Sequence, residues 1–536
     1  MVRESSLNLP FVTEADIQTP IKVDRLAFWL EGYDEEKKQK LIKGFSEGFE
    51  IGFEGKTNNE IPKNLKSSVQ MPHLVSEHIE KELKLGRIAG PFDSPPFSNF
   101  QCSPVGLVEK KEKGSYRMIH HLSHPEGSSV NDQIRSECSA VSYANIGDAI
   151  DIVMNLCPQA FMAKTDVKSA FRIVPLHPKT RNLFVFHWEG KFYVDLCMQM
   201  GCSSSCQIFE SLSSAVEWIA KSKLNIQMVH ILDDFFLASV SIQTGTYQLE
   251  TFLDMCKDIG LPMAPEKTFW PSNVMSFVGF EIDTVKQEVR LPIDKLQKCK
   301  DEITELLQKT NATLKELQSI IGLLNFACAV VLPGRAFLRR LIDLTIGLRA
   351  PHHRKRLTKG TKADLNLWLT FLSEFNGKSI FLDTHLTLNH DIHLYTDSSG
   401  SVGYGAILGN HWFNGIWSNW WTAQNIMLLE LYPIVLAVEI WGEKLQNKRL
   451  LMHTDNESLV SVLTKQTSKH PLAMILVRRL VLHCMRINLV ISAVHIAGEK
   501  NAIADSLSRL QMERFRALAP NANRHPCPIP ALPDRL

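Results

Sequence analysis

The stretch Ile231-Leu232-Asp233-Asp234 ends an apolar run in two consecutive carboxylates, and the run resumes directly with Phe235-Phe236-Leu237. Adjacent acids between two strand-like segments are typical of a β-hairpin tip, and carboxylate oxygens suit a hard divalent cation. Two adjacent aspartates with no other acid near them are more commonly part of a solvated turn. A third acid, Asp166, ends another strand-like run that begins at Ala163. Three carboxylates converging from two strands suit a pair of Mg²⁺ ions in phosphoryl transfer.

The segments around these acids occur in a specific order along the chain. Asp166 to Phe171 comes first, then Gly201-Cys202-Ser203-Ser204, and then Leu232-Asp233-Asp234. This order resembles the palm motifs of reverse transcriptases. Two further resemblances flank the palm: Ser103 to Lys111 with Tyr116 to Ile119 resembles the fingers, and Phe277-Val278-Gly279-Phe280 resembles the primer-grip hairpin. The ordered set implies a right-hand polymerase with fingers, palm and thumb.

The resemblance implies a metal site in the palm. Asp166 and Asp233 would ligate two Mg²⁺ ions about 4 Å apart, with Mn²⁺ as a substitute ion, and Asp234 would support the same site. One ion would activate the primer 3′-hydroxyl and the other would hold the nucleotide phosphates. Lys267 is matched to a general acid for pyrophosphate release.

The resemblance also implies residues that bind the nucleotide. Lys111 and Arg117 would neutralise the triphosphate, with Lys110 as the alternative to Lys111. Phe171 stands at the family's steric-gate position and would crowd a ribose 2′-hydroxyl, which favours deoxynucleotides. Gly201 would permit close backbone approach near template and nucleotide. Taken singly, the charged residues are equally well explained as surface charge, and Phe171 as a core aromatic.

A second set of acids occurs in the C-terminal third. Alternating strands lead to Asp397 and Asp455, Glu430 lies among leucines in a helical run, and Asp505 follows a last strand, Leu489 to His495. A carboxylate among apolar neighbours is costly to bury without a partner. The set resembles the ribonuclease H domain of retroelement polymerases. The resemblance implies that Asp397, Glu430, Asp455 and Asp505 hold two Mg²⁺ ions for hydrolysis, although each acid alone fits a helix cap or turn.

Composition is that of a large globular enzyme. The 536 residues are 44% hydrophobic and 22% charged, with a formal net charge of +2, so attraction to nucleic acid must come from local patches. One such patch lies between Arg335 and Lys362, interpreted as a track for a duplex rather than only a solvated surface. The 11 cysteines form no zinc or disulfide pattern. We expect no membrane-spanning segment and an intracellular location, cytoplasmic and/or nuclear.

The fold class expected is α+β multidomain: a right-hand polymerase followed by an α/β ribonuclease H-like domain. Apolar spacing from Leu296 to Leu307 and from Leu314 to Leu324 predicts two thumb helices. The expected domains are an N-terminal extension (1–65), fingers and palm (66–290), a helical thumb and connection with the basic patch (291–385), the ribonuclease H-like domain (386–512) and a Pro-rich disordered tail (513–536).

Phrases outside the palm narrow the resemblance. Gly86 to Phe92, Ile119 to Gly127 and Leu332 to Arg340 look like DIRS-type retrotransposons, which integrate through a tyrosine recombinase; Ty3-type elements are the near alternative. Two departures concern primer handling or fidelity: Ile231 replaces a tyrosine, and Gln199-Met200 replaces Pro-Phe. No recombinase or integrase motif is present, so integration would be supplied by another chain or domain.

These observations predict an RNA-directed DNA polymerase with ribonuclease H activity. Its partners would be an RNA template, a DNA primer, an RNA-DNA hybrid and deoxynucleoside triphosphates. A decayed or domesticated copy that binds nucleic acid without turnover is the alternative, and a structural protein with accidental motifs is remote. Activity, rather than affinity, separates the first two.

Overall fold

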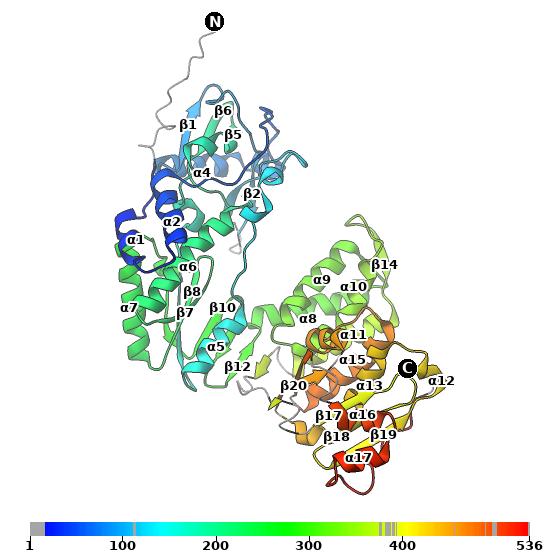
Figure 1. The fold of residues 1–536 in the computed structure, drawn as a ribbon. Coiled ribbons are helices and arrows are strands. Elements are labelled where there is room, and N and C mark those ends of the chain that lie inside the picture. The colour runs from blue at the N-terminus through cyan, green and yellow to red at the C-terminus, as the bar shows by residue number, and fades with distance from the viewer. Residues whose placement is uncertain are drawn as a thin grey trace. The chain divides into compact units, whose positions relative to one another are not determined.

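The computed structural model describes residues 17–110, 114–374, 378–380, 387–388, 392, 394–446, 448–454, 456–487, 489–495 and 501–533. The chain divides into two compact units, Met1–Val278 and Gly279–Leu536, and both mix helices with strands (Figure 1). The predicted α+β multidomain class is confirmed at this level. Among the described residues, no helix is both long and apolar enough to cross a membrane.

The first unit is built on a four-stranded sheet in the order β7-β8-β4-β9. The strands are β4 (Phe161–Asp166), β7 (Gln227–Ile231), β8 (Asp234–Ser239) and β9 (Phe269–Ser272). Helices α5 (Ile146–Leu156), α6 (Ser205–Lys223) and α7 (Ile242–Ile259) pack against it. Buried apolar residues from α6, α7 and the strands, such as Phe209, Phe235 and Phe252, form one core. This core fixes the strand ends that carry the acids.

Smaller sheets and helices complete the first unit. β1 (Ile88–Phe92), β6 (Lys191–Asp195) and β5 (Val185–Trp188) form an antiparallel sheet, and β2 (Val105–Glu109) pairs with β3 (Tyr116–His120). The helices here are α1 (Val23–Trp29), α2 (Glu35–Glu47), α3 (Lys66–Gln70) and α4 (Pro72–Lys84). Short 3₁₀ helices η5 (Ala170–Ile173), η6 (Pro178–Leu183) and η7 (Pro265–Lys267) connect the strands, and β10 (Val274–Phe277) ends the unit.

The second unit begins with helices. α8 (Ile293–Gln308) and α9 (Leu314–Ala327) confirm the two helices predicted from apolar spacing, and Leu296, Ile303, Leu317 and Leu324 are buried as that spacing requires. η8 (Leu332–Phe337), α10 (Arg339–Thr345) and α11 (Lys359–Glu374) follow. Strands β11 (Phe280–Asp283), β12 (Glu288–Arg290) and β15 (Lys378–Ile380) form one antiparallel arrangement, and β13 (Asn311–Thr313) pairs with β14 (Arg354–Arg356).

The C-terminal part of this unit holds two three-stranded sheets. β17 (Leu394–Ser398), β18 (Gly403–Leu408) and β19 (His411–Ile416) are antiparallel, whereas β16 (Thr387–Leu388), β20 (Arg449–Thr454) and β21 (Val490–His495) are parallel. The accompanying helices are α12 (Asn419–Thr422), α13 (Ile426–Leu445), α14 (Glu457–Lys465), α15 (Pro471–Arg486), α16 (Ala502–Ser508) and α17 (Met512–Leu518). The hairpin predicted to carry Asp397 is β17–β18.

The structure differs from the predicted disordered tail. α17 buries Phe515 completely against Trp412, with ring centroids 5.0 Å apart. Beyond it, the indole Nε1 of Trp412 donates to the carbonyl of Asn523 at 2.7 Å, and the amide of Cys527 donates to the carbonyl of Trp412 at 2.6 Å. Proline content alone misled the prediction, because these contacts to β19 order the segment.

Candidate active site

The paired acids lie at a hairpin turn, as the sequence predicts. β7 ends at Ile231 and β8 begins at Asp234, so Leu232 and Asp233 form the turn. Leu232 has φ +52, a left-handed conformation that a leucine rarely adopts without support. Asp166 at the end of β4 pairs directly with Asp234 on β8. The amide of Val167 donates to the carbonyl of Asp233 at 2.9 Å. The three carboxylates therefore come from adjacent positions on neighbouring strands.

Electrostatics at this strand end reflect crowded negative charge. Burial and the neighbouring Asp166 raise the pKa of Asp233. Burial, with the charges of Asp166 and Asp233 opposing Lys164, raises the pKa of Asp234 to about 6. Carboxylates that repel one another in a half-buried position gain from a nearby cation.

Lys267 supplies a protein cation at the same place. Its Nζ lies 2.8 Å from Oδ1 of Asp166. Burial lowers the pKa of this lysine, but the hydrogen bond with Asp166 and the charges of all three aspartates raise it overall. Lys267 is therefore a charged ammonium at neutral pH.

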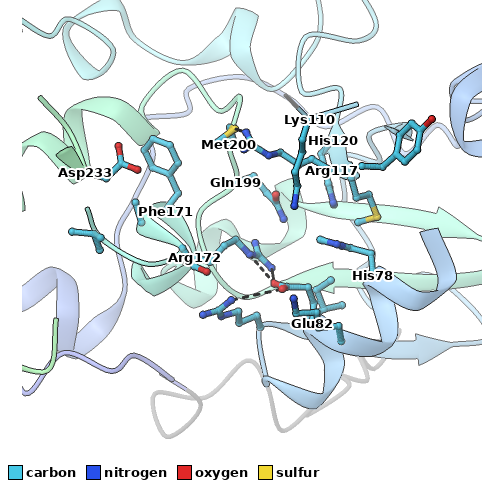
Figure 2. A pocket seen from close by; sticks show the side chains of 18 of the residues that line it. His78, Glu82, Lys110, Arg117, His120, Phe171, Arg172, Gln199, Met200 and Asp233 are labelled. Carbon is cyan, nitrogen blue, oxygen red and sulfur yellow. Dashed lines mark hydrogen bonds and ion pairs between the residues drawn. The ribbon is translucent and has the colours of Figure 1, made fainter. Parts of the chain in front are cut away.

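A cavity of about 540 Å³ adjoins the acids. Asp233 and Phe171 line one part of it, and Lys110 and Arg117 line another (Figure 2). Lys267 also lines the cavity. Both basic residues are exposed, on or beside the β2–β3 hairpin. Arg117 Nη1 lies 2.7 Å from Sδ of Met200. Of the two fingers lysines considered from the sequence, Lys111 lies outside the described residues, and Lys110 lines the cavity.

Phe171 and Gly201 differ in their relation to this cavity. Phe171 lies on the 3₁₀ helix η5 and its ring packs edge-on against Phe209 of α6 at 5.6 Å, so the side chain is braced while it lines the cavity. Gly201 has φ +101, which favours glycine, and a Cβ there would meet only the carbonyl of His120 at 3.9 Å. Gly201 is not among the residues that line the cavity, whereas its neighbours Gln199 and Met200 are.

Part of the chain matches a known protein family. Residues 108–282 match the family model described as "Reverse transcriptase (RNA-dependent DNA polymerase)". This segment contains Asp166, Phe171, Asp233, Asp234 and Lys267. The chain carries a reverse transcriptase domain.

Two retroviral polyproteins are similar in sequence to parts of this chain. It is 26% identical over 176 residues to the Pro-Pol polyprotein of feline foamy virus, which covers 33% of the chain and 14% of that protein. It is 22% identical over 315 residues to the Gag-Pro-Pol polyprotein of Simian retrovirus SRV-2, 55% of the chain and 15% of that protein. The chain thus spans about a seventh of the length of these relatives.

A solved structure shares the fold. The foamy viral protease-reverse transcriptase solved with double-stranded DNA superposes with a TM-score of 0.51 at 17% identity, covering 92% of this chain and 83% of that one. The similarity supports the polymerase fold. It leaves the type of retroelement, DIRS or Ty3, undetermined.

Metal binding in the reverse transcriptase domain fits the donor chemistry. Hard divalent cations take carboxylate oxygens, and the crowded acids at the β4 and β8 ends supply them. In the part of the chain that the structure describes, however, no three His, Cys, Asp or Glu side chains are already arranged to hold an ion. The Lys267 ammonium already pairs with one of these carboxylates, that of Asp166.

The second set of acids is partly brought together. Asp397 on β17 accepts from Ser508 Oγ of α16 at 2.5 Å, and the neighbouring Ser398 Oγ donates to the carbonyl of Leu429, which precedes Glu430 on α13. Thr454 Oγ1 donates to Glu430 at 3.4 Å. Asp455 itself lies outside the described residues.

Asp505 is held by two arginines. Arg509 Nε lies 2.6 Å and Arg514 Nη1 2.7 Å from its carboxylate oxygens. Burial opposes ionisation, but the hydrogen bonds from both arginines lower the pKa of Asp505 overall. Its charge is therefore already neutralised by protein groups.

Sequence reasoning missed two networks beside the polymerase acids. His230 on β7 lies between the carboxylates of Glu210 and Glu217 on α6. Arg172 binds Glu82 and Asp195 beside the cavity. An ionisable residue within the apolar run that ends at Ile231 was the available signal for the first network, because such a residue needs a partner when buried.

Proposed function

We propose that this chain is an RNA-directed DNA polymerase that also hydrolyses the RNA strand of an RNA-DNA hybrid, and that it serves a retrotransposon of the DIRS or Ty3 type. The observation that carries the polymerase proposal is the cavity at the β7–β8 turn. Asp233, whose pKa is raised and which directly precedes Asp234, lines one part of it, and the exposed cations Lys110 and Arg117 line another. A nucleoside triphosphate requires this polarity, since its phosphates must face cations while its α-phosphorus reaches the acids.

Each residue then has a role set by its position. Asp166, Asp233 and Asp234 would hold two Mg²⁺ ions; bound Mg²⁺ lowers the pKa of the primer hydroxyl and stabilises charge on the phosphates. Arg117 and Lys110 bind the triphosphate, Arg117 by its planar fork. The braced ring of Phe171 faces the sugar and excludes a 2′-hydroxyl.

Lys267 is placed to move a proton. Its ammonium is charged at neutral pH and lines the cavity. With the Asp166 carboxylate committed to a metal ion, the Lys267 ammonium would be free to donate a proton to the leaving pyrophosphate.

The C-terminal acids support the ribonuclease H proposal. Asp397, Glu430 and Asp505 come from β17, α13 and α16, and both helices contact β17. With Asp455 they would bind two Mg²⁺ ions and direct water to the RNA backbone.

Nucleic acid is the proposed partner. The foamy viral structure described above was solved with double-stranded DNA, and we extend duplex binding to this chain, with an RNA template, a DNA primer and deoxynucleoside triphosphates as substrates. A recombinase or integrase would be supplied by another chain or domain.

The test is Mg²⁺-dependent extension of a DNA primer on an RNA template, with cleavage of the template followed in parallel. An Asp233→Asn, Asp234→Asn variant should lose extension and keep cleavage, and an Asp397→Asn variant should do the reverse. Asp254→Asn, a change at an exposed position on α7 that does not line the cavity, is the matched control. A wild-type chain that binds hybrid but neither extends nor cleaves would establish the decayed, binding-only alternative.

A further inference from the structure

Arg172 directly follows Phe171 on η5, and its guanidinium binds three separate elements of the cavity wall. Nε and Nη2 lie 3.0 and 2.9 Å from Oε2 of Glu82 on α4. Nη2 also lies 2.8 Å from Oδ1 of Asp195, the last residue of β6. Nη1 donates to the carbonyls of Cys197 and Met198 at 3.2 and 3.4 Å. Figure 2 shows Arg172 between Phe171, Gln199 and Glu82.

These contacts exclude Arg172 from binding substrate. All three guanidinium nitrogens are engaged, and the side chain is only 16% exposed. Lys110 and Arg117, in contrast, present exposed side chains to the same cavity. Arg172 therefore acts on protein groups and not on phosphate.

We call these contacts of Arg172 the clamp: they join Glu82, Asp195 and the carbonyls of Cys197 and Met198. The positive charge of Arg172 is needed here as well. Glu82 and Asp195 are buried, with 5% and 0% exposure, and buried carboxylates are costly without partners. Arg87 approaches Glu82 only to 3.6 Å, and His120, whose pKa is lowered by burial, lies 3.3 Å from Asp195. Although burial opposes its charge, Asp195 and then Cys197 and Glu82 raise the pKa of Arg172. Arg172 is thus a permanent cation at the junction of α4, β6 and η5.

The residues adjoining the clamp are those that would face a nucleotide. Phe171 shares the short η5 backbone with Arg172, and its ring has Phe209 as its other brace. Cys197 and Met198 lead directly into Gln199, which lines the cavity. The guanidinium of Arg172 therefore fixes the positions of two cavity segments relative to α4: the η5 backbone that carries Phe171, and the Cys197-Met198 segment that precedes Gln199.

We propose that Arg172 is a positioning residue that sets the sugar selectivity of the nucleotide pocket by fixing Phe171 against the position of the ribose 2′-carbon. This inference rests on the proposed polymerase function. It follows that loosening the clamp lets the ring retreat, and ribonucleotides gain access while the metal-binding acids are unchanged. Lysine cannot replace this arginine, because an ammonium carries charge but lacks the planar fork that spans Glu82, Asp195 and two carbonyls.

The experiment compares Arg172→Lys, Phe171→Val and the double variant by primer extension. The readout is kcat/KM for each deoxynucleotide divided by kcat/KM for the matching ribonucleotide. Arg172→Lys should lower this ratio about tenfold, through gained ribonucleotide use and a higher KM for deoxynucleotides, with kcat for deoxynucleotides nearly kept. The double variant should fall no lower than Phe171→Val, because Arg172 acts through that ring.

Arg181→Lys is the matched control. Arg181 is also fully buried and donates from Nε to the carbonyl of Leu176 at 3.2 Å, but it lies on η6 and does not line the cavity. Its ratio should equal that of the wild type. If Arg172→Lys does not fold, Glu82→Gln is tested instead. This change weakens the contact between Arg172 and α4 but leaves the contacts of Arg172 with Asp195 and the two carbonyls. It should lower the deoxynucleotide-to-ribonucleotide ratio as well.

The outcomes separate the clamp from the proposed function. A wild type that extends primers, with an unchanged ratio in the Arg172 variant (or in Glu82→Gln where that one decides), overturns the clamp alone. Independent losses that add in the double variant overturn it as well. A wild type that incorporates no nucleotide overturns the proposed function, and the selectivity role of Arg172 with it.

Discussion

The imidazole of His230 is bound to the carboxylate of Glu210, with Nε2 2.9 Å from Oε1. The second oxygen of Glu210 accepts the amide of Leu232 at 3.3 Å. On the other side of the ring, Nδ1 of His230 contacts Glu217, which also accepts the His230 amide at 3.1 Å. Helix α6 therefore grips the β7–β8 hairpin one residue before Asp233, at the position where Leu232 has a left-handed backbone.

Weakening this grip should slow polymerisation. In a His230→Leu variant, Glu210 loses its cationic partner and the turn at Leu232 loses its support, so Asp233 is less well positioned to hold the proposed Mg²⁺ ions. Partners that orient metal ligands commonly matter 10- to 100-fold in activity or metal affinity. We expect a loss in that range, with a higher Mg²⁺ concentration at half-maximal extension.

The control for this variant is Lys221→Met. Lys221 pairs with the opposite oxygen of Glu217 at 2.6 Å and is half-exposed, so it touches the same glutamate without touching the turn. Its Mg²⁺ requirement should match the wild type. An equal effect of both variants would show that the grip on the turn has no special role.

Stability should depend on pH through the same histidine. Burial lowers its pKa, but the hydrogen bonds with Glu210 and Glu217 outweigh burial and raise the pKa of His230 to about 9. A raised folded-state pKa means that the stabilisation is fully present below the unfolded value of about 6.5 and is lost as pH rises through 9. The contribution is on the order of 3 kcal/mol.

Thermal unfolding of wild type and His230→Leu between pH 6 and pH 10 measures this. The difference in midpoint should be largest near pH 6 and should shrink steadily toward pH 10. Burial raises the pKa of Glu217, but its hydrogen bonds with His230 and Lys221 outweigh burial and lower this pKa overall. The stabilisation from Glu217 is therefore lost only in acid, below the pH range of this experiment. A constant difference across the range would mean that the histidine is neutral in the folded protein.

Removing Arg514 should ease metal binding at the C-terminal acids. Its guanidinium and that of Arg509 neutralise Asp505, so an incoming cation competes with them. Arg514 is about half-exposed, and such ion pairs contribute about 1 kcal/mol at most. An Arg514→Ala variant should therefore need up to about fivefold less Mg²⁺ for template cleavage. Primer extension in the same reaction serves as the internal control and should be unchanged; a raised Mg²⁺ requirement for cleavage would contradict the competition.

Local sequence was enough to predict the strands that lead to the candidate acids. Asp166 ends β4, Asp233 lies in the turn that follows β7, and Asp397 is the next-to-last residue of β17, so each acid follows an apolar stretch that is visible within a few residues. The His230–Glu210 pair spans 20 residues, and Arg172 and Glu82 are 90 apart. Such pairings depend on how α4 and α6 pack against strands, which no local pattern encodes. The prediction of a disordered tail failed for the same reason, because the tail contacts Trp412, a residue more than a hundred positions earlier in the chain.

The basic segment gives the last prediction, on nucleic-acid binding. Arg354 and Arg356 lie two positions apart on β14, so their side chains point to the same side of the strand, and both are exposed. A duplex lying along this strand would bring one phosphate to each arginine, and each such contact releases a counterion. An Arg354→Ser, Arg356→Ser variant should bind a hybrid duplex more weakly at low salt, and the slope of log affinity against log salt should fall in magnitude by about 2.

The control variant is Lys40→Ser, Lys43→Ser on the exposed face of α2, which removes the same charge elsewhere on the protein and so controls for net charge. Because phosphate contacts carry no sequence information, the loss should be equal for hybrids of unrelated sequence. An equal loss of slope in both double variants would assign the effect to overall charge, and β14 would then be a solvated surface.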